Sequence, residues 1–159
     1  MTKRMARYLP AAAEPKHDAR SYNRRMSAVA ERLTRFFERR AHGAIAVYLF
    51  GSAARGDARP GSDVDIAVLF DAPPEATLDG PRLTLEGELE AALGLSVDLV
   101  SLNTAPPDLV HRVLRDGIIV FDDDRARRIR FEVARRNEYF DLEPIRRRYR
   151  KTAAGAGSS

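Results

Sequence analysis

The chain has 159 residues, of which 44% are hydrophobic and 31% are charged, a composition typical of a soluble folded domain rather than a disordered chain. It contains no cysteine, which excludes disulfides, thiolate zinc sites and cysteine nucleophiles. The net charge of +4 hides a segregation: residues 1–43 and 125–159 each carry eleven Lys or Arg against four Asp or Glu, whereas residues 44–124 carry five against fifteen. The acidic middle suits carboxylates gathered around cations, and the basic ends suit phosphate or an acidic partner.

Two further features bear on the compartment of the protein. No apolar run approaches the roughly 18 residues that a membrane-spanning helix requires. Residues 1–17 lack the long apolar segment of a secretory signal. We therefore expect a cytoplasmic protein that does not associate with a membrane.

The first half of the chain predicts an arm, a helix and two strands. Residues 1–25 show no sustained period and are expected to form a flexible basic arm. Apolar residues at helical spacing then predict an amphipathic helix over 26–42. The segments AIAVYLF (44–50) and DVDIAVLF (63–70) are typical of buried strands, and the Gly- and Ser-rich loop 51–62 joins them.

The second half of the chain alternates helices and strands. It predicts a helix over 81–93, a strand over 96–102, a helix over 106–116, a strand over 117–121 and an arginine-rich helix from about residue 122. Thr104 is predicted to cap the helix over 106–116, and Pro144 to break or kink the last helix. Apolar residues recur at helical spacing along that last helix, at Ala126, Ile129, Val133 and Phe140.

Strands interleaved with helices predict an α/β fold, a small mixed sheet flanked by helices. Residues 26–151 would form one domain that includes a long C-terminal helix, and residues 152–159 a flexible tail. The roughly thirty residues after the last predicted strand are too few to build a second core. If the chain acts on a second molecule, we therefore expect the site for that molecule to be very small or to be shared with a partner.

Three carboxylates interrupt apolar strand segments, at Asp63, Asp65 and Asp98. Because side chains alternate along a strand, Asp63 and Asp65 are expected to share one face, with Asp98 beside them if the strands are neighbours. Clustering three anions costs free energy unless cations neutralise them. Magnesium suits such a site, and two ions could clamp a phosphoryl group. The alternatives are an exposed polar strand face for the first pair and a sheet-edge position for Asp98.

The loop before this strand offers groups that suit phosphate. Gly51 and Ser52 follow a strand directly, and residues 53–55 can begin a short helix whose free N–H groups would face phosphate oxygens. Gly51 permits close approach of the backbone. Arg55 could neutralise a nucleotide phosphate or a leaving pyrophosphate. The alternatives are that Ser52 only caps a helix and that Arg55 is an ordinary surface residue.

The spacing Gly51-Ser52, ten residues, Asp63-Val64-Asp65 resembles the signature of the DNA polymerase β-like nucleotidyltransferase superfamily. The short chain, with Ala54-Arg55-Gly56 and Ser62-Asp63, is similar to its minimal nucleotidyltransferase (MNT) branch. The later segments SVDLVSL, PPDLVHRVLRDGIIVF and RIRFEVARRNEYFDLEPIRRRY resemble the same branch, so the resemblance covers roughly residues 26–150.

The resemblance implies transfer of a nucleoside monophosphate from a nucleoside triphosphate to a hydroxyl. In many pairs of this branch the MNT protein is the antitoxin of a HEPN-domain toxin, and it transfers AMP from ATP to a tyrosine of that toxin, which blocks its RNase activity. Asp63, Asp65 and Asp98 match the metal ligands, and Asp98 matches the acceptor of the attacking hydroxyl's proton. The positions that match the nucleotide-binding elements are Gly51, Ser52, Arg55 and Ser62.

Other readings remain open at this stage. The chain could modify a small molecule of the aminoglycoside type, neutralise a toxin by sequestration alone, or regulate through nucleic acid bound to its basic ends. RNA contact at the terminal arginine cluster (Arg146–Arg148, Arg150 and Lys151) is not favoured. The acidic run Asp122–Asp124 is interpreted as the start of a helix rather than as a metal site. The three histidines share no ligand spacing.

Overall fold

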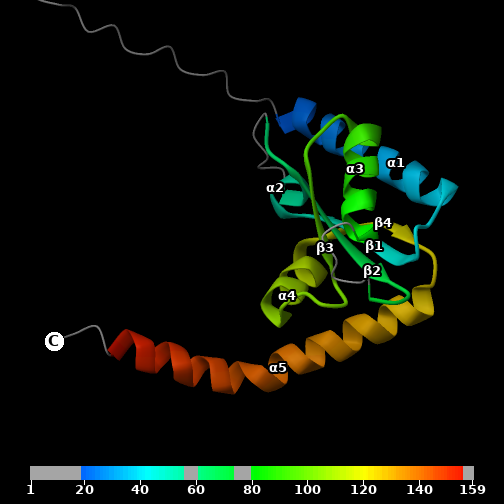
Figure 1. Cartoon of the computed structure of the whole chain (residues 1–159). Coiled ribbons are helices and arrows are strands. Elements are labelled where there is room, and N and C mark those ends of the chain that lie inside the picture. Colours follow the sequence, from blue (N-terminus) through cyan, green and yellow to red (C-terminus); the bar gives the residue numbers. More distant parts are fainter. Residues whose placement is uncertain (1–18, 56–60, 74–79, 156–159) are drawn as a thin grey trace, which may run out of the picture.

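The computed structural model describes residues 19–55, 61–73 and 80–155, and it contains a four-stranded mixed sheet (Figure 1). The strand order is β3-β2-β1-β4. The strands are β1 (Ala44–Phe50), β2 (Val64–Phe70), β3 (Val97–Ser101) and β4 (Ile118–Asp122). β1 pairs antiparallel with both β2 and β4, whereas β2 and β3 run parallel. The predicted mixed sheet and α/β class are therefore confirmed.

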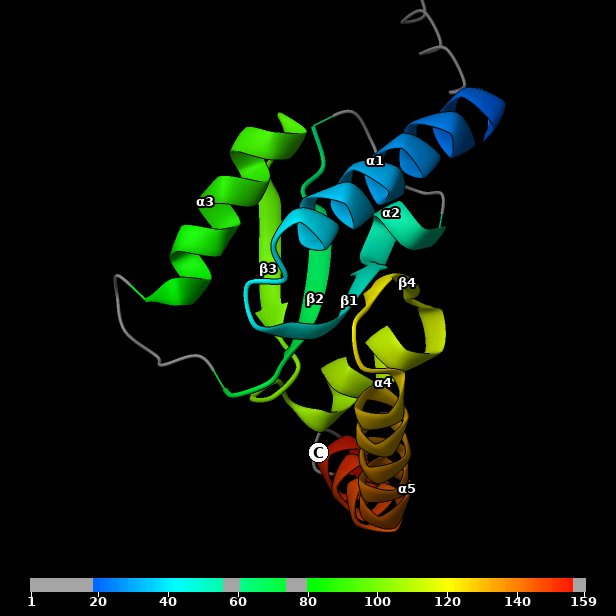
Figure 2. The same ribbon diagram turned by 90° about the vertical axis from the view of Figure 1, so that its right-hand side faces the viewer.

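Five helices surround this sheet. They are α1 (Ala19–Arg39), α2 (Gly51–Arg55), α3 (Pro81–Leu93), α4 (Pro107–Asp116) and α5 (Arg125–Gly155). α1 and α3 cover one face, and α4 and α5 lie against the other (Figure 2). The short α2 continues directly from the end of β1. None of the helices in the described part of the chain combines the length and the hydrophobicity that a transmembrane span needs.

The α1/α3 face holds the larger apolar core. Leu33 and Phe37 of α1 and Leu89 of α3 are almost completely buried against the strands. The sheet contributes alternate residues of each strand to this face, which include Val64, Ile66 and Val68 of β2. Alternation therefore sends the intervening residues of β2 to the α4/α5 face. There Ala67 and Leu69 pack with Val110 and Val113 of α4.

A buried ionic network fastens the first half of α5 to the sheet. Arg128 pairs with Asp122 at 2.9 Å and with Glu132 at 2.6 Å. Tyr48 of β1 donates a hydrogen bond to the same Glu132 at 2.9 Å. Burial and the adjacent Glu132 raise the pKa of the Tyr48 phenol well above its usual range, so it stays protonated as a donor. Asp124 accepts a hydrogen bond from the Arg127 amide, which supports the helix-start interpretation of this acidic run.

Replacing Arg128 with Met is expected to lower the free energy of unfolding by about 3 kcal/mol, because it leaves two acidic partners without their cation in a largely buried site. The matched control is Arg35→Met, whose ion pair with Glu31 is exposed and contributes roughly 0.5 kcal/mol or less. Urea denaturation of both variants measures the difference. Equal and small losses would show that the network does not hold α5.

The structure differs from the sequence prediction at several boundaries. α1 begins at Ala19 rather than at residue 26, because the polar residues of its first two turns give no apolar stripe to detect. The rest of the predicted arm, residues 1–18, lies outside the described residues. α5 continues through Pro144 without a break and ends at Gly155, inside the predicted tail. Pro144 is exposed, so the carbonyl that loses its donor there is open to water.

Two smaller predictions also need correction. Thr104 does not cap α4: the N-cap is Pro106, no side chain makes a cap hydrogen bond, and Pro107 removes one of the N–H groups that would need it. β2 begins at Val64, so Asp63 precedes the strand instead of lying in it.

Candidate active site

Asp65 and Asp98 lie side by side at the beginnings of two neighbouring strands. They are direct partners in the parallel register of β2 and β3. Val64 and Ile66, on either side of Asp65, face the α1/α3 core, so Asp65 points to the α4/α5 face. Partners in register share a face, so Asp98 points the same way. The backbone geometry therefore places Asp65 and Asp98 on the same face of the sheet, as the sequence predicts.

Gly51 lies directly against the Asp65 carboxylate. Phe50, the last residue of β1, pairs with Asp65, and Gly51 follows with a φ of +70°. A Cβ placed on Gly51 would lie 1.9 Å from Oδ2 of Asp65 and 2.7 Å from its Cγ. A side chain at this position would displace either the Asp65 carboxylate or the turn, and the left-handed backbone conformation also favours glycine. The sheet thus holds an acid in contact with the turn that opens α2.

The electrostatics of Asp65 link all three predicted acids. Burial raises the pKa of the Asp65 carboxyl above its usual value, and the negative charges of Asp98 and Asp63 raise it further. The guanidinium of Arg55 acts in the opposite direction. Asp63 is exposed just before β2, and Asp98 is exposed on β3. The ionised Asp65 carboxylate is therefore half-buried and is destabilised by the charges of Asp63 and Asp98. The charge of Arg55 offsets this effect only in part.

The remaining predicted residues lie on the two segments beside this acid. Gly51 and Ser52 are the first residues of α2, and Arg55 is its last. Ser52 is half-buried and Arg55 is exposed. Ser62 lies two residues before the beginning of β2 and is half-buried. The turn and the acids therefore occupy one corner of the sheet, where β1 ends and β2 and β3 begin.

The donors in this corner fit a hard divalent cation. All are carboxylate oxygens, the ligand type that magnesium prefers, and their mutual repulsion is what a bound cation would relieve. Within the described residues no three acidic or histidine side chains already form a complete metal cage. Magnesium does not need one, because it is commonly held by one or two carboxylates together with substrate phosphates and water.

α4 contributes charges that the sequence prediction did not include. The pKa of the Asp116 carboxyl is lowered chiefly by its hydrogen bond from Arg115, and also by the charges of Arg55 and Arg112. Arg55 and Arg112 are thus both within electrostatic reach of one carboxylate, and α2 contacts α4. In the sequence, Arg112 is one polar residue of an amphipathic helix. Only the packing of α4 against α2 distinguishes it from other surface arginines.

Comparison with known proteins identifies the family. Residues 31–126 match the family described as polymerase beta, nucleotidyltransferase, and this span includes the whole carboxylate corner. The chain belongs to this nucleotidyltransferase family. A protein adenylyltransferase MntA of Thermococcus cleftensis is 42% identical over 72 residues, which is 45% of this chain and 70% of that protein. The MntA protein adenylyltransferase of Shewanella oneidensis is also 42% identical over 72 residues, 49% of its length.

A solved structure extends the similarity of this nucleotidyltransferase over most of its fold. A crystal structure of a toxin–antitoxin with AMP-PNP aligns with a TM-score of 0.67 and 26% identity, and the alignment covers 79% of this chain and 98% of that chain. The resemblance proposed from the Gly-Ser and Asp-x-Asp spacing is therefore confirmed. So is the nucleotidyltransferase fold with its long C-terminal helix.

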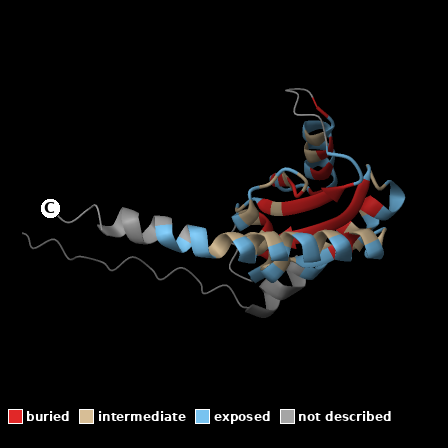
Figure 3. Ribbon diagram, turned by 90° about the horizontal axis from the view of Figure 1, so that it is seen from below, coloured by how far each residue is buried: buried red, intermediate tan, exposed pale blue. Residues whose placement is uncertain are grey.

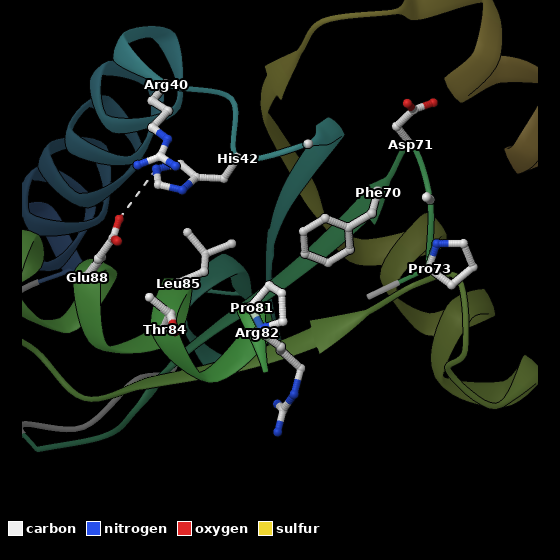
Figure 4. Close-up of a pocket in the computed structure, with 12 residues that line it drawn as sticks. Arg40, His42, Phe70, Asp71, Pro73, Pro81, Arg82, Thr84, Leu85 and Glu88 are labelled. Carbon is white, nitrogen blue, oxygen red and sulfur yellow. Dashed lines mark ion pairs between the residues drawn. The ribbon is translucent and has the colours of Figure 1, made fainter. Parts of the chain in front are cut away.

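The nucleotidyltransferase also has a hollow that is separate from the carboxylate corner. It has a volume of about 700 Å³ and lies between the end of α1, the end of β2 and the start of α3 (Figure 4). His42 and Glu88 lie together on one side of it, with His42 Nε2 3.6 Å from Glu88 Oε2. Phe70 lines it five residues beyond Asp65, roughly 17 Å along the strand at about 3.3 Å per residue. Phe70 also packs in the α1/α3 core, so the hollow and the acids lie on opposite faces of the sheet.

Replacing Asp65 with Asn is expected to stabilise the free protein at neutral pH. Because the folded-state pKa of Asp65 is raised, the ionised carboxylate destabilises the fold as the pH rises above about 3.8. The variant should be more stable than the wild type at pH 7, and should lose this advantage as the pH falls below the usual Asp value. Asp116→Asn should do the opposite, because the folded pKa of Asp116 is lowered. Unfolding midpoints at pH 3.5 and pH 7 measure both, and a stability loss in Asp65→Asn at pH 7 would contradict the repulsion.

Proposed function

We propose that this nucleotidyltransferase is a protein adenylyltransferase and an antitoxin: it transfers AMP from ATP to a tyrosine hydroxyl of a HEPN-type RNase toxin. The observation that carries the proposal is the Asp65 carboxylate lying against Gly51 and beside Asp98. The names of the two MntA relatives and the toxin–antitoxin structure with AMP-PNP, an ATP analogue, support the choice of ATP and of a protein acceptor.

The residues of the carboxylate corner have different roles in the proposed reaction. Asp63, Asp65 and Asp98 would hold Mg²⁺, with two ions expected, and the metal would neutralise charge on the triphosphate. Gly51 and Ser52 would bind triphosphate oxygens through backbone N–H groups and the Ser52 hydroxyl. Ser62, in the adjacent loop, would complete the nucleotide contacts.

The tyrosine oxygen attacks the α-phosphorus of ATP, and the bond from that phosphorus to the bridging oxygen breaks, which releases pyrophosphate. Asp98 accepts the proton of the attacking hydroxyl. Arg55, together with Arg112 of α4, neutralises the charge that develops on the leaving pyrophosphate. The AMP left on the toxin is bulky and anionic, so it would block a site that binds RNA phosphate.

Two differently labelled forms of ATP test this proposal. The chain is incubated with Mg²⁺, a cognate HEPN protein and ATP labelled at either the α- or the γ-phosphate. We expect label on the HEPN protein from α-labelled ATP only, and none when EDTA removes the metal. An aminoglycoside added in excess should not divert the label. Transfer from γ-labelled ATP would indicate phosphorylation instead, and a stable complex without any label would favour sequestration.

A further inference from the structure

The outward face of α5 carries a row of exposed apolar side chains, which Arg136 interrupts. Ile129, Val133 and Phe140 expose 42%, 49% and 61% of their surfaces. At 100° per residue they lie within about 40° of one another around the helix axis. Ala126 and Pro144 are exposed on the same side. Figure 3 shows this exposed face of α5 seen from below the molecule.

The protein's own core does not use this stripe, because the opposite face of α5 makes the internal contacts. Glu132 bonds to Tyr48 of β1, and Phe131 packs against the core of the α4/α5 face. Tyr139 stacks on His111 of α4 with ring centroids 3.8 Å apart. α5 is therefore apolar on two sides, one of which has no partner within the described residues. An exposed stripe of large apolar side chains marks an interaction site.

The charges around the stripe indicate the chemistry of the partner. Among the side chains of α5 that the structure describes between residues 125 and 148, the exposed charged ones are Arg125, Arg130, Arg136, Arg147, Arg148 and Asp141. Arg136 and Arg147 pair with Glu132 and Glu143 of the same helix at 3.5 Å and 3.2 Å. The exposed cations still outnumber the exposed anion, which favours an acidic partner surface. A second copy of the chain on this stripe would place arginine against arginine. Nucleic acid would match the arginines but would leave the large apolar side chains at the centre of the stripe without apolar contacts.

We propose that the α5 stripe, defined as Ile129, Val133 and Phe140 with the flanking Arg125 and Arg130, docks the acceptor protein through an apolar surface edged with carboxylates. The identity of this partner as the HEPN protein rests on the proposed function. The stripe spans roughly three helical turns, and α5 packs on α4, which in turn contacts α2. A partner held on α5 is thus held on the sheet face that carries Asp65 and Asp98. Most of the stripe lies beyond residue 126, where the family match ends.

A triple Gln variant tests the stripe without changing charge and without lowering helix propensity. Ile129→Gln, Val133→Gln and Phe140→Gln together should raise the Kd for the HEPN protein roughly tenfold or more, measured by titration calorimetry without ATP. The matched control is Leu83→Gln with Leu95→Gln, since these residues expose 43% and 39% of their surfaces outside α5. This control should bind like the wild type. Arg125→Glu with Arg130→Glu should weaken binding and reduce its dependence on salt.

Three kinds of result overturn the proposal. An unchanged Kd in the triple variant, or no binding by the wild-type chain, removes the α5 stripe as the docking surface. A wild-type dimer that the triple variant dissociates, seen by sedimentation, assigns the stripe to a second copy. Loss of binding to an RNA oligonucleotide in the triple variant, with HEPN binding intact, assigns it to nucleic acid. A stripe-dependent complex in which no AMP is transferred would uphold the docking and refute the proposed enzyme activity.

Discussion

Replacing Asp63 and Asp65 together with Asn is expected to lower kcat/KM for AMP transfer by about 10³-fold or more, equal to roughly 4 kcal/mol of transition-state stabilisation. The two amides keep the shape of the carboxylates but cannot neutralise a divalent cation. The triphosphate would then face Asp98 with little compensation. The rate is measured by the incorporation of α-labelled phosphate into the HEPN protein.

The variant should remain folded, because removal of charge at Asp65 relieves repulsion from its neighbours. It should also bind the HEPN protein as tightly as the wild type, since the α5 stripe is unchanged. The control is Asp123→Asn with Glu38→Gln, two exposed acids away from both the site and α5 that should leave the rate unchanged. Transfer at the wild-type rate by the Asp63 and Asp65 double variant would refute the assignment of the metal ligands.

Replacing Gly51 with Ala is expected to reduce transfer about 100-fold or more, equal to roughly 2.7 kcal/mol. The new methyl group would lie 1.9 Å from Oδ2 of Asp65, so either the carboxylate or the turn must move. Because both belong to the proposed site, any relaxation displaces a group that acts on the triphosphate. The same labelled-ATP assay measures the loss, and thermal unfolding measures the accompanying change in stability.

A control at Gly94 distinguishes the effect of the steric clash with Asp65 from the effect of backbone strain alone. Gly94, at the end of α3, has a φ of +65°, and an added Cβ there meets nothing within 4 Å. Gly94→Ala should therefore destabilise the fold by about 1 kcal/mol, from the left-handed conformation alone, and leave transfer intact. If both alanine variants retained activity equally, the contact between Gly51 and Asp65 would have no role in the reaction.

The parts of the site that depend on local pattern could be predicted from the sequence. Alternation along a strand places Asp65 on the face of the sheet that Val64 and Ile66 do not occupy. The apolar character of residues 96–102 predicts a neighbouring strand that carries Asp98. The contact between Gly51 and Asp65 could not be predicted in the same way, since it depends on how β1 pairs with β2. The position of Arg112 beside α2 depends on helix packing, which has no local signal.

α5 shows most clearly what periodicity leaves undetermined. The recurrence of Ile129, Val133 and Phe140 correctly predicts a helix, but a period alone does not say whether an apolar face is packed or exposed. The structure packs the other face, which carries Glu132, Arg128 and Phe131. Charged residues of this kind give no hydrophobic signal, although Arg128 is buried. For the same reason, periodicity did not predict the first turns of α1, whose residues are polar.

A single diffraction measurement tests the central claim that the acids and the Gly51 turn form one site for metal and triphosphate. Crystals of the chain are grown with Mn²⁺ and a non-hydrolysable ATP analogue, and anomalous scattering locates the manganese. We predict a manganese ion bound to the Asp65 carboxylate, with Asp63 or Asp98 as a second protein ligand, and triphosphate oxygens on the Gly51 and Ser52 amides. Manganese elsewhere, or a triphosphate seated in the hollow beside His42 and Glu88, would contradict the account.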